Sequence, residues 1–395
     1  MRVDPLISAL APMEEGPCWF QRLYAKEPNL MKVVLQPRAR AYAKTRCTPG
    51  AQRKTGRKGM ESRIKKEGSN LNRRFSLLLL VCLIGVSLYV SFSLAGAGQA
   101  SGHRTWKLDP STPILTGGAP GQFDARLEEA DAYMSGSTYY VNYAAWDKEQ
   151  GTVGSIGQAS GPSLTRLTKK GQILKGTPGA WDSAYVSGPR TYCEASKYYL
   201  YYFGSSTVAF EGIPSSLGVA IASSPGGAFK KYKGNPILSP GPAGTWDGKQ
   251  LFRPFLVKSG ATYYLFYNAN GSLGGEQIGF ATGPGPVGPF TRYKGNPSFF
   301  PKRAWEASRV GDPMIYKDGS TWVMYYYGAN DSIEYWGVGC ATSGDLVTWT
   351  ECPDNPLSFP KIGFGLIRPS LLSENNYGTM LLDGIPTNSL YVARR

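Results

Sequence analysis

Histidine is nearly absent from this sequence: among its 395 residues, only His103 is a histidine. A Ser-His-Asp or Cys-His catalytic site needs a histidine inside the fold, and a multi-histidine metal site needs several. His103 lies at the edge of a polar linker. Catalytic sites of these kinds are therefore excluded, and no metal site is predicted.

Cysteine is also scarce, with six residues in the chain and no pair at CxxC spacing. Only Cys193, Cys340 and Cys352 follow the hydrophobic run described below. A disulfide framework is therefore not predicted. Cys340 could pair with Cys352, but we expect buried free thiols.

The excess of positive charge is confined to one end of the chain. Residues 1–100 contain 17 Lys and Arg against 6 Asp and Glu, whereas residues 101–395 contain 26 against 22. The longer part is nearly neutral, so the basic composition does not indicate a nucleic-acid partner.

One long hydrophobic run covers residues 75–92, and no charged residue occurs between Arg74 and His103. A helix of this length can cross a bilayer, and the basic residues before it would keep that flank in the cytoplasm. Small residues at 94–100 fit a signal-peptidase site, so cleavage after Ala97 or Ala100 and an uncleaved anchor both stay open. We predict that residues 101–395 are extracellular, periplasmic or membrane-anchored, with membrane contact limited to residues 75–95.

The first hundred residues divide into two segments, of which the second contains this run. Residues 60–100 are the predicted signal peptide or signal anchor, since Met60 begins a basic stretch of the usual kind. Residues 1–59 show no apolar period and are expected to be disordered. They are either a cytoplasmic tail or an upstream extension that is not translated.

Residues 101–395 contain a repeat of about sixty residues. Each unit begins with an aromatic-acid pair: Phe123-Asp124, Trp181-Asp182, Trp246-Asp247 and Trp305-Glu306. A small residue or proline follows seven or eight positions later, at Ala130, Pro189, Pro254, Pro313 and Pro369. Next come a tyrosine-rich stretch such as 198–202, a glycine-rich stretch such as 217–223, and an Asn-Pro phrase such as 235–236. Their period-two alternation is typical of strands.

The two ends of the repeat region complement each other. The last unit stops at Arg395 without its fourth phrase, whereas a similar phrase follows Trp106 before the first complete unit. We therefore predict an all-β fold: a five-bladed β-propeller of four-stranded blades, preceded by one hydrophobic helix. Residues 106–115 should pair with residues 389–394 and close the ring.

These WD, xP, YYxxY and NPIL phrases resemble the furanosidase-type propellers, namely glycoside hydrolase family 43 and its relatives in families 32, 62 and 68. The resemblance implies an arabinanase-, levansucrase- or invertase-type hydrolase that binds carbohydrate and inverts the anomeric configuration. Export is expected from the hydrophobic run, and the protein is expected to be a monomer. The resemblance also implies no organic cofactor, but allows a structural calcium ion in the channel.

Glycoside hydrolysis needs two carboxyl groups, one ionised and one protonated. In a propeller they come from the innermost strands, here between the aromatic-acid pair and the proline. The resemblance places the base in the first blade and the other acids two and three repeats later, which selects Glu129 or Asp131, then Asp247, then Glu306. Asp312 is a further candidate because Gly311-Asp312-Pro313 resembles the family's Asp-Pro phrase.

Equivalent positions in the other blades supply candidate substrate-binding residues. Glu129 aligns with Gly188, Arg253, Asp312 and Arg368, and a six-residue step along an extended strand should turn Asp247 toward the same face as Arg253. Arg253 and Arg368 could bind sugar groups or form ion pairs. A larger set could line the channel or serve as turn caps and inter-blade core: Asp182, Trp181, Trp246 and Trp305.

The sequence departs from family 43 at the motifs themselves. That family commonly has Asp-Pro in the first blade and Glu-Gly-Pro at the acid, whereas this chain has Glu129-Ala130 and Gly311-Asp312-Pro313. A non-catalytic carbohydrate-binding or scaffold propeller at the cell surface is therefore the alternative to a hydrolase. A glycoside phosphorylase that binds phosphate through Arg253 or Arg368 is a third possibility.

Overall fold

A computed structural model describes residues 9–12, 33–36, 106–148, 153–208, 214–272, 274–359, 365–372, 377–385 and 388–395. The contacts of the chain divide it into two units, residues 1–96 and 97–395. In the first, β1 (Ala9–Pro12) pairs in parallel with β2 (Val33–Gln36). The predicted membrane segment lies outside the described residues, and none of the helices within them is long and apolar enough to cross a membrane.

The second unit is all-β, and its strands form sheets that we call blades 1 to 5 in chain order. Blade 1 contains β5 (Arg126–Ser135), β6 (Thr138–Trp146), β7 (Gly154–Gly161) and β8 (Thr168–Lys175). Blade 2 contains β9 (Tyr185–Glu194), β10 (Lys197–Ser205), β11 (Ser216–Ala222) and β12 (Lys230–Lys231). Blade 3 contains β13 (Gln250–Ser259), β14 (Thr262–Asn270), β15 (Glu276–Gly283) and β16 (Thr291–Arg292).

Blade 4 contains β17 (Arg309–Asp318), β18 (Thr321–Asn330), β19 (Tyr335–Ser343) and β20 (Thr350–Glu351). Blade 5 contains β21 (Gly365–Leu372), β22 (Thr379–Ile385) and β23 (Ser389–Arg394). Neighbouring strands within each blade are antiparallel. Two short 3-10 helices also lie in the described part of this unit: η2 (Ala304–Glu306) and η3 (Asp331–Ile333).

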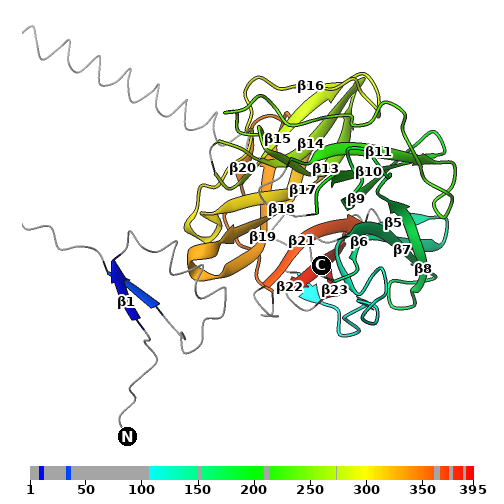
Figure 1. Ribbon diagram of the computed structural model, residues 1–395, viewed down its shortest axis with the longest axis horizontal. Helices are drawn as coiled ribbons and strands as arrows, with labels where there is room; N and C mark the ends of the chain where they lie inside the picture. The colour runs from blue at the N-terminus through cyan, green and yellow to red at the C-terminus, as the bar shows by residue number, and fades with distance from the viewer. Residues whose placement is uncertain are drawn as a thin grey trace, which may run out of the picture. The chain divides into compact units, whose positions relative to one another are not determined.

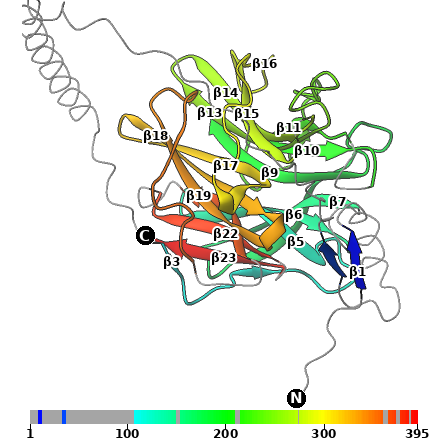
Figure 2. The same ribbon diagram turned by 90° about the vertical axis from the view of Figure 1, so that its left-hand side faces the viewer.

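The fourth strand of blade 5 comes from the other end of this unit. Strands β3 (Lys107–Leu108) and β4 (Leu115–Thr116) both pair antiparallel with β23. Figure 2 shows β3 beside β23, close to the C-terminus. The predicted pairing of residues 106–115 with 389–394 is confirmed, and the outer edge of β23 is covered.

The blades surround a common centre (Figure 1). Their innermost strands contact one another in the cyclic order β5, β9, β13, β17, β21 and back to β5. The hydrophobic cores lie between neighbouring blades; for example, one joins Leu381 and Leu390 of blade 5 to Leu127 and Val141 of blade 1. This cyclic packing is consistent with the predicted five-bladed propeller.

The Asn-Pro phrase extends the very short fourth strands. Asn235, Asn296 and Asn355 each accept a hydrogen bond from a backbone N–H of the third strand and donate one to the same residue's carbonyl. A side-chain amide that donates and accepts in this way continues the ladder where the backbone turns off.

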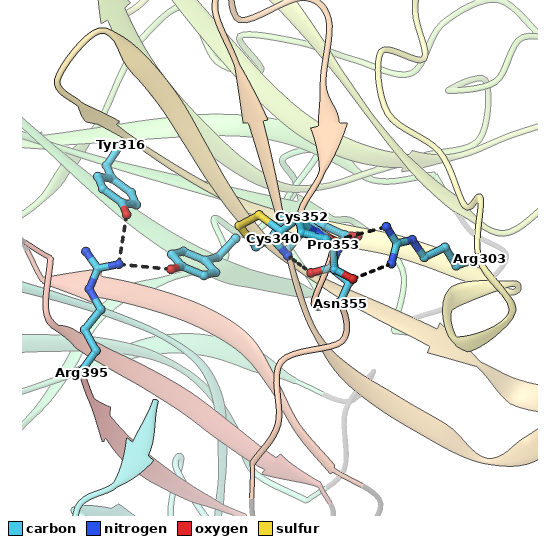
Figure 3. Close-up of a disulfide and its surroundings, with 9 residues drawn as sticks. Arg303, Tyr316, Cys340, Cys352, Pro353, Asn355 and Arg395 are labelled. Atoms are coloured by element: carbon cyan, nitrogen blue, oxygen red, sulfur yellow. Dashed lines mark hydrogen bonds between the residues drawn. A yellow bond between two sulfur atoms is a disulfide. The ribbon is translucent and has the colours of Figure 1, made fainter. Parts of the chain in front are cut away.

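The expectation of free thiols was wrong for one pair of cysteines. Cys340 on β19 and Cys352, just after β20, form a disulfide whose Cα atoms are 5.3 Å apart (Figure 3). Antiparallel pairing brings them together, because the Cys352 N–H donates to the Cys340 carbonyl at 2.8 Å. Sequence separation alone could not show this cross-strand register.

Candidate functional site

One backbone position is unusual in the same way in every blade. Glu129, Gly188, Arg253, Asp312 and Arg368 all have left-handed φ values, between 41° and 60°. At each, the innermost strand shifts register against its neighbour. The predicted equivalence of these five residues is confirmed.

Glycine adopts this conformation without steric cost, as Gly188 does in blade 2. The other four blades carry charged residues there, and a non-glycine residue with such a φ costs about 1–3 kcal/mol. Strain of this kind persists where the side chain serves a purpose that glycine cannot.

The guanidinium of Arg253 joins the two carboxylates of this set. Its Nη2 lies 2.5 Å from Glu129 Oε1, and its Nε lies 3.2 Å from Asp312 Oδ2. Glu129, Arg253 and Asp312 are all buried, and Ser187 donates a further hydrogen bond to Glu129 Oε2 at 2.6 Å. Three residues from different blades thus meet in one buried cluster.

Two more arginines complete this cluster. Arg190 on β9 binds Asp312 Oδ1 at 3.1 Å, and Arg368 Nη1 binds Glu128 at 2.6 Å and Asp383 at 3.4 Å. The Nε of Arg368 lies 3.8 Å from Glu129 and 3.7 Å from Asp312. We call the whole set the axial cluster: Glu128, Glu129, Asp131, Glu276, Asp312, Asp383, Arg190, Arg253 and Arg368.

Carboxyl groups outnumber guanidinium groups in the axial cluster, so burial disfavours the ionised form of some of them. Burial raises the pKa of Asp131 and of Asp312 above the ordinary range, and raises that of Asp383 to about 7. Glu129 differs, because Arg253 and Arg368 outweigh its burial and hold its pKa below the usual value. Glu129 and Asp312 therefore contact the same arginine, yet their pKa values are shifted in opposite directions.

Asp131 lies further along β5 and binds different partners. Its Oδ2 accepts a hydrogen bond from the Thr191 N–H at 2.7 Å, and Ser370 lies 3.5 Å from its Oδ1. These contacts link β5 to β9 and β21. Its predicted catalytic role remains a prediction.

The acids of the aromatic-acid pairs face the interior of their own blades, not the axial cluster. The innermost strands begin only after these acids and are bulged, so the six-residue count along an extended strand was wrong. Asp182, Asp247 and Glu306 each accept a hydrogen bond from a second-strand tyrosine, at 3.0, 3.0 and 2.9 Å. Asp182 and Asp247 also pair with Lys231 at 2.5 Å and Arg292 at 2.6 Å, on the fourth strands.

This repeated arrangement has the form of a turn cap. The Asp182 carboxylate accepts from the Thr177 N–H and the Glu306 carboxylate from the Lys302 N–H, at 3.2 and 3.1 Å. The three tryptophans pack on the same tyrosines: Trp181 on Tyr202, Trp246 on Tyr267 and Trp305 on Tyr326. Whether these acids or tryptophans also act on a substrate remains a prediction.

A pocket of about 230 Å³ opens beside the axial cluster between blades 3 and 4. It lies at the start of β13 and β17, and its wall includes Glu276, whose Oε2 binds Arg253 at 3.3 Å. The lining is mostly polar: Gln250, Phe252, Asn270, Gly275, Glu276, Ser308, Arg309 and Asp331. A larger pocket of about 360 Å³, lined by Thr321, Thr342 and Asp345 among others, lies on blade 4 without touching the cluster.

Sequence reasoning missed Glu128, Arg190, Glu276 and Asp383. Glu276 and Asp383 are not on innermost strands, so the channel-strand rule could not select them. The sequence does carry a signal for Asp383. It is a charged residue at a position where blade 2 has Phe203 and blade 4 has Tyr327.

The axial cluster does not fit the calcium ion that the resemblance allows. Calcium takes six to eight oxygen ligands, whereas Arg190, Arg253 and Arg368 already bind the carboxylates here. Within the described ranges, no group of three or more His, Cys, Asp or Glu side chains could hold a metal.

No family model matches the chain. No curated protein matches its sequence either. Solved structures do match. One of them, named simply as a glycoside hydrolase, has a TM-score of 0.59 at 21% identity, covering 71% of this chain and 89% of its own.

Two further matches are named as glycoside hydrolases of particular families. A family 117 glycoside hydrolase, Zg3597 from the marine bacterium Zobellia galactanivorans, has a TM-score of 0.56 at 15% identity, covering 73% and 90% of the two chains. A thermostable family-43 glycoside hydrolase has a TM-score of 0.55 at 17% identity, covering 72% and 91%. At these identities the likeness shows the fold alone, and membership of family 43 is not established.

Proposed function

We propose that the chain is a glycoside hydrolase of the five-bladed propeller type, and that Glu129 and Asp312 are its catalytic pair. The observation that supports this most is the contrast between them. Both contact Arg253, yet the pKa of Glu129 is lowered and that of Asp312 is raised. Titratable pairs whose environments push their pKa values apart are typical of acid-base catalysis.

The proposed roles follow from the directions of these two pKa shifts. As the general base, Glu129 would take a proton from a water molecule while the oxygen of that water bonds to the anomeric carbon. As the general acid, Asp312 would give a proton to the leaving oxygen while the glycosidic bond breaks. Arg253 would keep the two groups in register. The polar pocket at Glu276 would receive the sugar, since its amide, hydroxyl and carboxylate groups suit sugar hydroxyls.

Inversion of the anomeric configuration and a monomeric state belong to the same proposal. The support for inversion is the sequence resemblance to the furanosidase-type propellers.

A specific observation favours the alternative, a non-catalytic carbohydrate-binding or scaffold propeller. Glu129 and Asp312 are fully buried and each is bound by arginine, which is also the arrangement of a structural ion network. A phosphorylase has less support, because Arg253 and Arg368 already bind carboxylates where phosphate would have to bind.

Export of this unit to an extracellular, periplasmic or membrane-anchored location is also a proposal. The Cys340–Cys352 disulfide supports it, because disulfides persist in oxidising compartments.

The test is a screen of the full chain against aryl arabinofuranosides, xylosides, galactosides and fructans, with and without phosphate. If the chain is a hydrolase, Glu129→Gln and Asp312→Asn should each lower kcat/KM about a hundredfold or more while the protein stays folded. Loss of turnover in folded Asp247→Asn or Glu306→Gln would point to the set that the repeat spacing predicted. Glycan binding without turnover would establish the binding protein instead, and phosphate-dependent turnover the phosphorylase.

A further inference from the structure

Asp383 on β22 is a buried carboxyl group that touches the backbone of Glu129. Its Oδ2 accepts a hydrogen bond from the Glu129 N–H at 2.5 Å and lies 3.4 Å from Arg368 Nη1. The residue is 2% exposed, and its Oδ1 has no hydrogen-bond partner among the described residues.

Blade 3 provides a natural comparison for this residue. Asn268 pairs with Phe252, just before Arg253, as Asp383 pairs with Ile367, just before Arg368. Asn268 Oδ1 accepts from the Asp312 N–H at 3.3 Å, so each side chain holds the left-handed residue of the next blade. An amide is sufficient for that task in blade 3, and the carboxyl group in blade 5 therefore needs another reason.

The charged groups that face Asp383 supply that reason. They are Arg368 on β21 and Glu128 and Glu129 on β5, whereas its partner on β23 is Leu390. Arg368 is shared, because it binds Glu128 and Asp383 and also lies 3.8 Å from Glu129 and 3.7 Å from Asp312. A change of charge on Asp383 therefore changes how Arg368 acts on the proposed catalytic pair.

We propose that Asp383 is a positioning residue: it holds the backbone of Glu129 and, by gaining or losing a proton, sets the share of the Arg368 charge that acts on Glu129 and Asp312. The catalytic role of Glu129 rests on the proposed function, whereas the electrostatic coupling between Asp383 and Glu129 does not. Burial raises the pKa of Asp383 to about 7, so the change falls in the neutral range.

The test compares wild type with Asp383→Asn, which keeps the acceptor that Asn268 provides in blade 3. Asp124→Asn is the matched control, because Asp124 is equally buried but binds Tyr143 and Lys169 away from the axial cluster. Carboxyl ¹³C NMR of the full chain, labelled at Asp and Glu, would follow Asp383 and Glu129 with pH, each assigned from its Asn or Gln variant.

In wild type and in Asp124→Asn, the Glu129 signal should shift near pH 7 together with that of Asp383, and in Asp383→Asn this shift should be absent. Titration of Asp383 in the ordinary acidic range, or a Glu129 signal that ignores it, would overturn the proposal. Neither outcome depends on whether the chain cleaves glycans.

A kinetic measurement adds the link to catalysis if the screen finds a substrate. As Asp383 ionises near pH 7, the wild-type kcat should change about tenfold, because a charge that appears a few ångströms from another ionisable group has an effect of this size. Asp383→Asn should lose this step while KM stays within about twofold. An unchanged pH profile in a folded Asp383→Asn variant would contradict positioning, whereas no turnover in wild type would contradict only the proposed function.

Discussion

Removal of the Arg253 guanidinium should destabilise the protein strongly, because three buried carboxylates depend on it. Arg253 lies 2.5 Å from Glu129, 3.2 Å from Asp312 and 3.3 Å from Glu276. Methionine is similar in length and has no charge. The conformational cost of the left-handed φ at this position is about the same for methionine and arginine. Arg253→Met therefore isolates the loss of the charge.

Breaking a buried ion pair by removing one partner costs about 3–5 kcal/mol. A loss of this size is a third or more of the stability of a typical domain, which is about 5–15 kcal/mol. The matched control is Arg292→Met, whose side chain is 32% exposed and pairs with Asp247 at 2.6 Å. Because water can reach this partly exposed guanidinium and Asp247 keeps its hydrogen bond from Tyr267, the control should lose less, about 1 kcal/mol.

The effect should also depend on pH, with a predictable sign. In wild type the pKa of Glu129 is lowered, so its contribution to stability is present above its unfolded pKa and is lost as the pH falls through its folded value. Without Arg253, burial should raise that pKa above the unfolded value, and the folded variant would bind a proton more readily than the unfolded chain. The stability deficit of the variant should therefore shrink as the pH falls from neutral to mildly acidic.

Denaturant unfolding of the full chain, followed by the fluorescence of its 9 tryptophans, measures these differences. The double variant Glu129→Gln, Arg253→Met should recover part of the loss, with a coupling energy of about 0.5–3 kcal/mol. A deficit for Arg253→Met no larger than that of Arg292→Met, and equal at both pH values, would refute the view that the axial cluster is held together by this arginine.

Three further predictions follow from the fold. Deletion of residues 101–116 should expose the edge of β23, and a lower thermal midpoint or aggregation is expected, whereas an unchanged melting curve would contradict closure by this segment. Replacing both Cys340 and Cys352 by serine should cost about 2–3 kcal/mol, because the disulfide closes a short loop, and an unchanged denaturant midpoint would show that the native chain does not use it. A reporter fused after residue 395 should be active only outside the cytoplasm, and cytoplasmic activity would exclude export of this unit.

The sequence predicted the blades well because their signal is local and repeated. The alternation of Tyr199, Tyr201 and Phe203 on one face of β10 against Tyr198 and Tyr202 on the other is readable from period alone. Closure was also readable, since a missing fourth strand at one end matched a spare phrase at the other. The membrane segment, by contrast, lies outside the described residues and stays a prediction.

The site was harder to predict because repetition conceals it. The acids that follow an aromatic residue in four successive units resemble a catalytic set that lines a channel. Their repetition instead indicates a structural role, because each accepts a hydrogen bond from a tyrosine of its own blade: Tyr143, Tyr202, Tyr267 and Tyr326. The left-handed position that supplies the centre of the axial cluster, by contrast, differs from blade to blade: Glu129, Gly188, Arg253, Asp312 and Arg368.

Charge balance explains why such unlike residues are found together. A carboxylate buried alone on one strand would be too costly, but Glu129 and Asp312 are neighbours of Arg253 and Arg368 once the ring closes. The sequence of one repeat cannot show these ion pairs, because each partner comes from another blade. In this fold a charged residue that departs from the other copies of its repeat is therefore the better guide to the site. Asp383 is an example, because the equivalent residues in the other blades are uncharged: Ala144, Phe203, Asn268 and Tyr327.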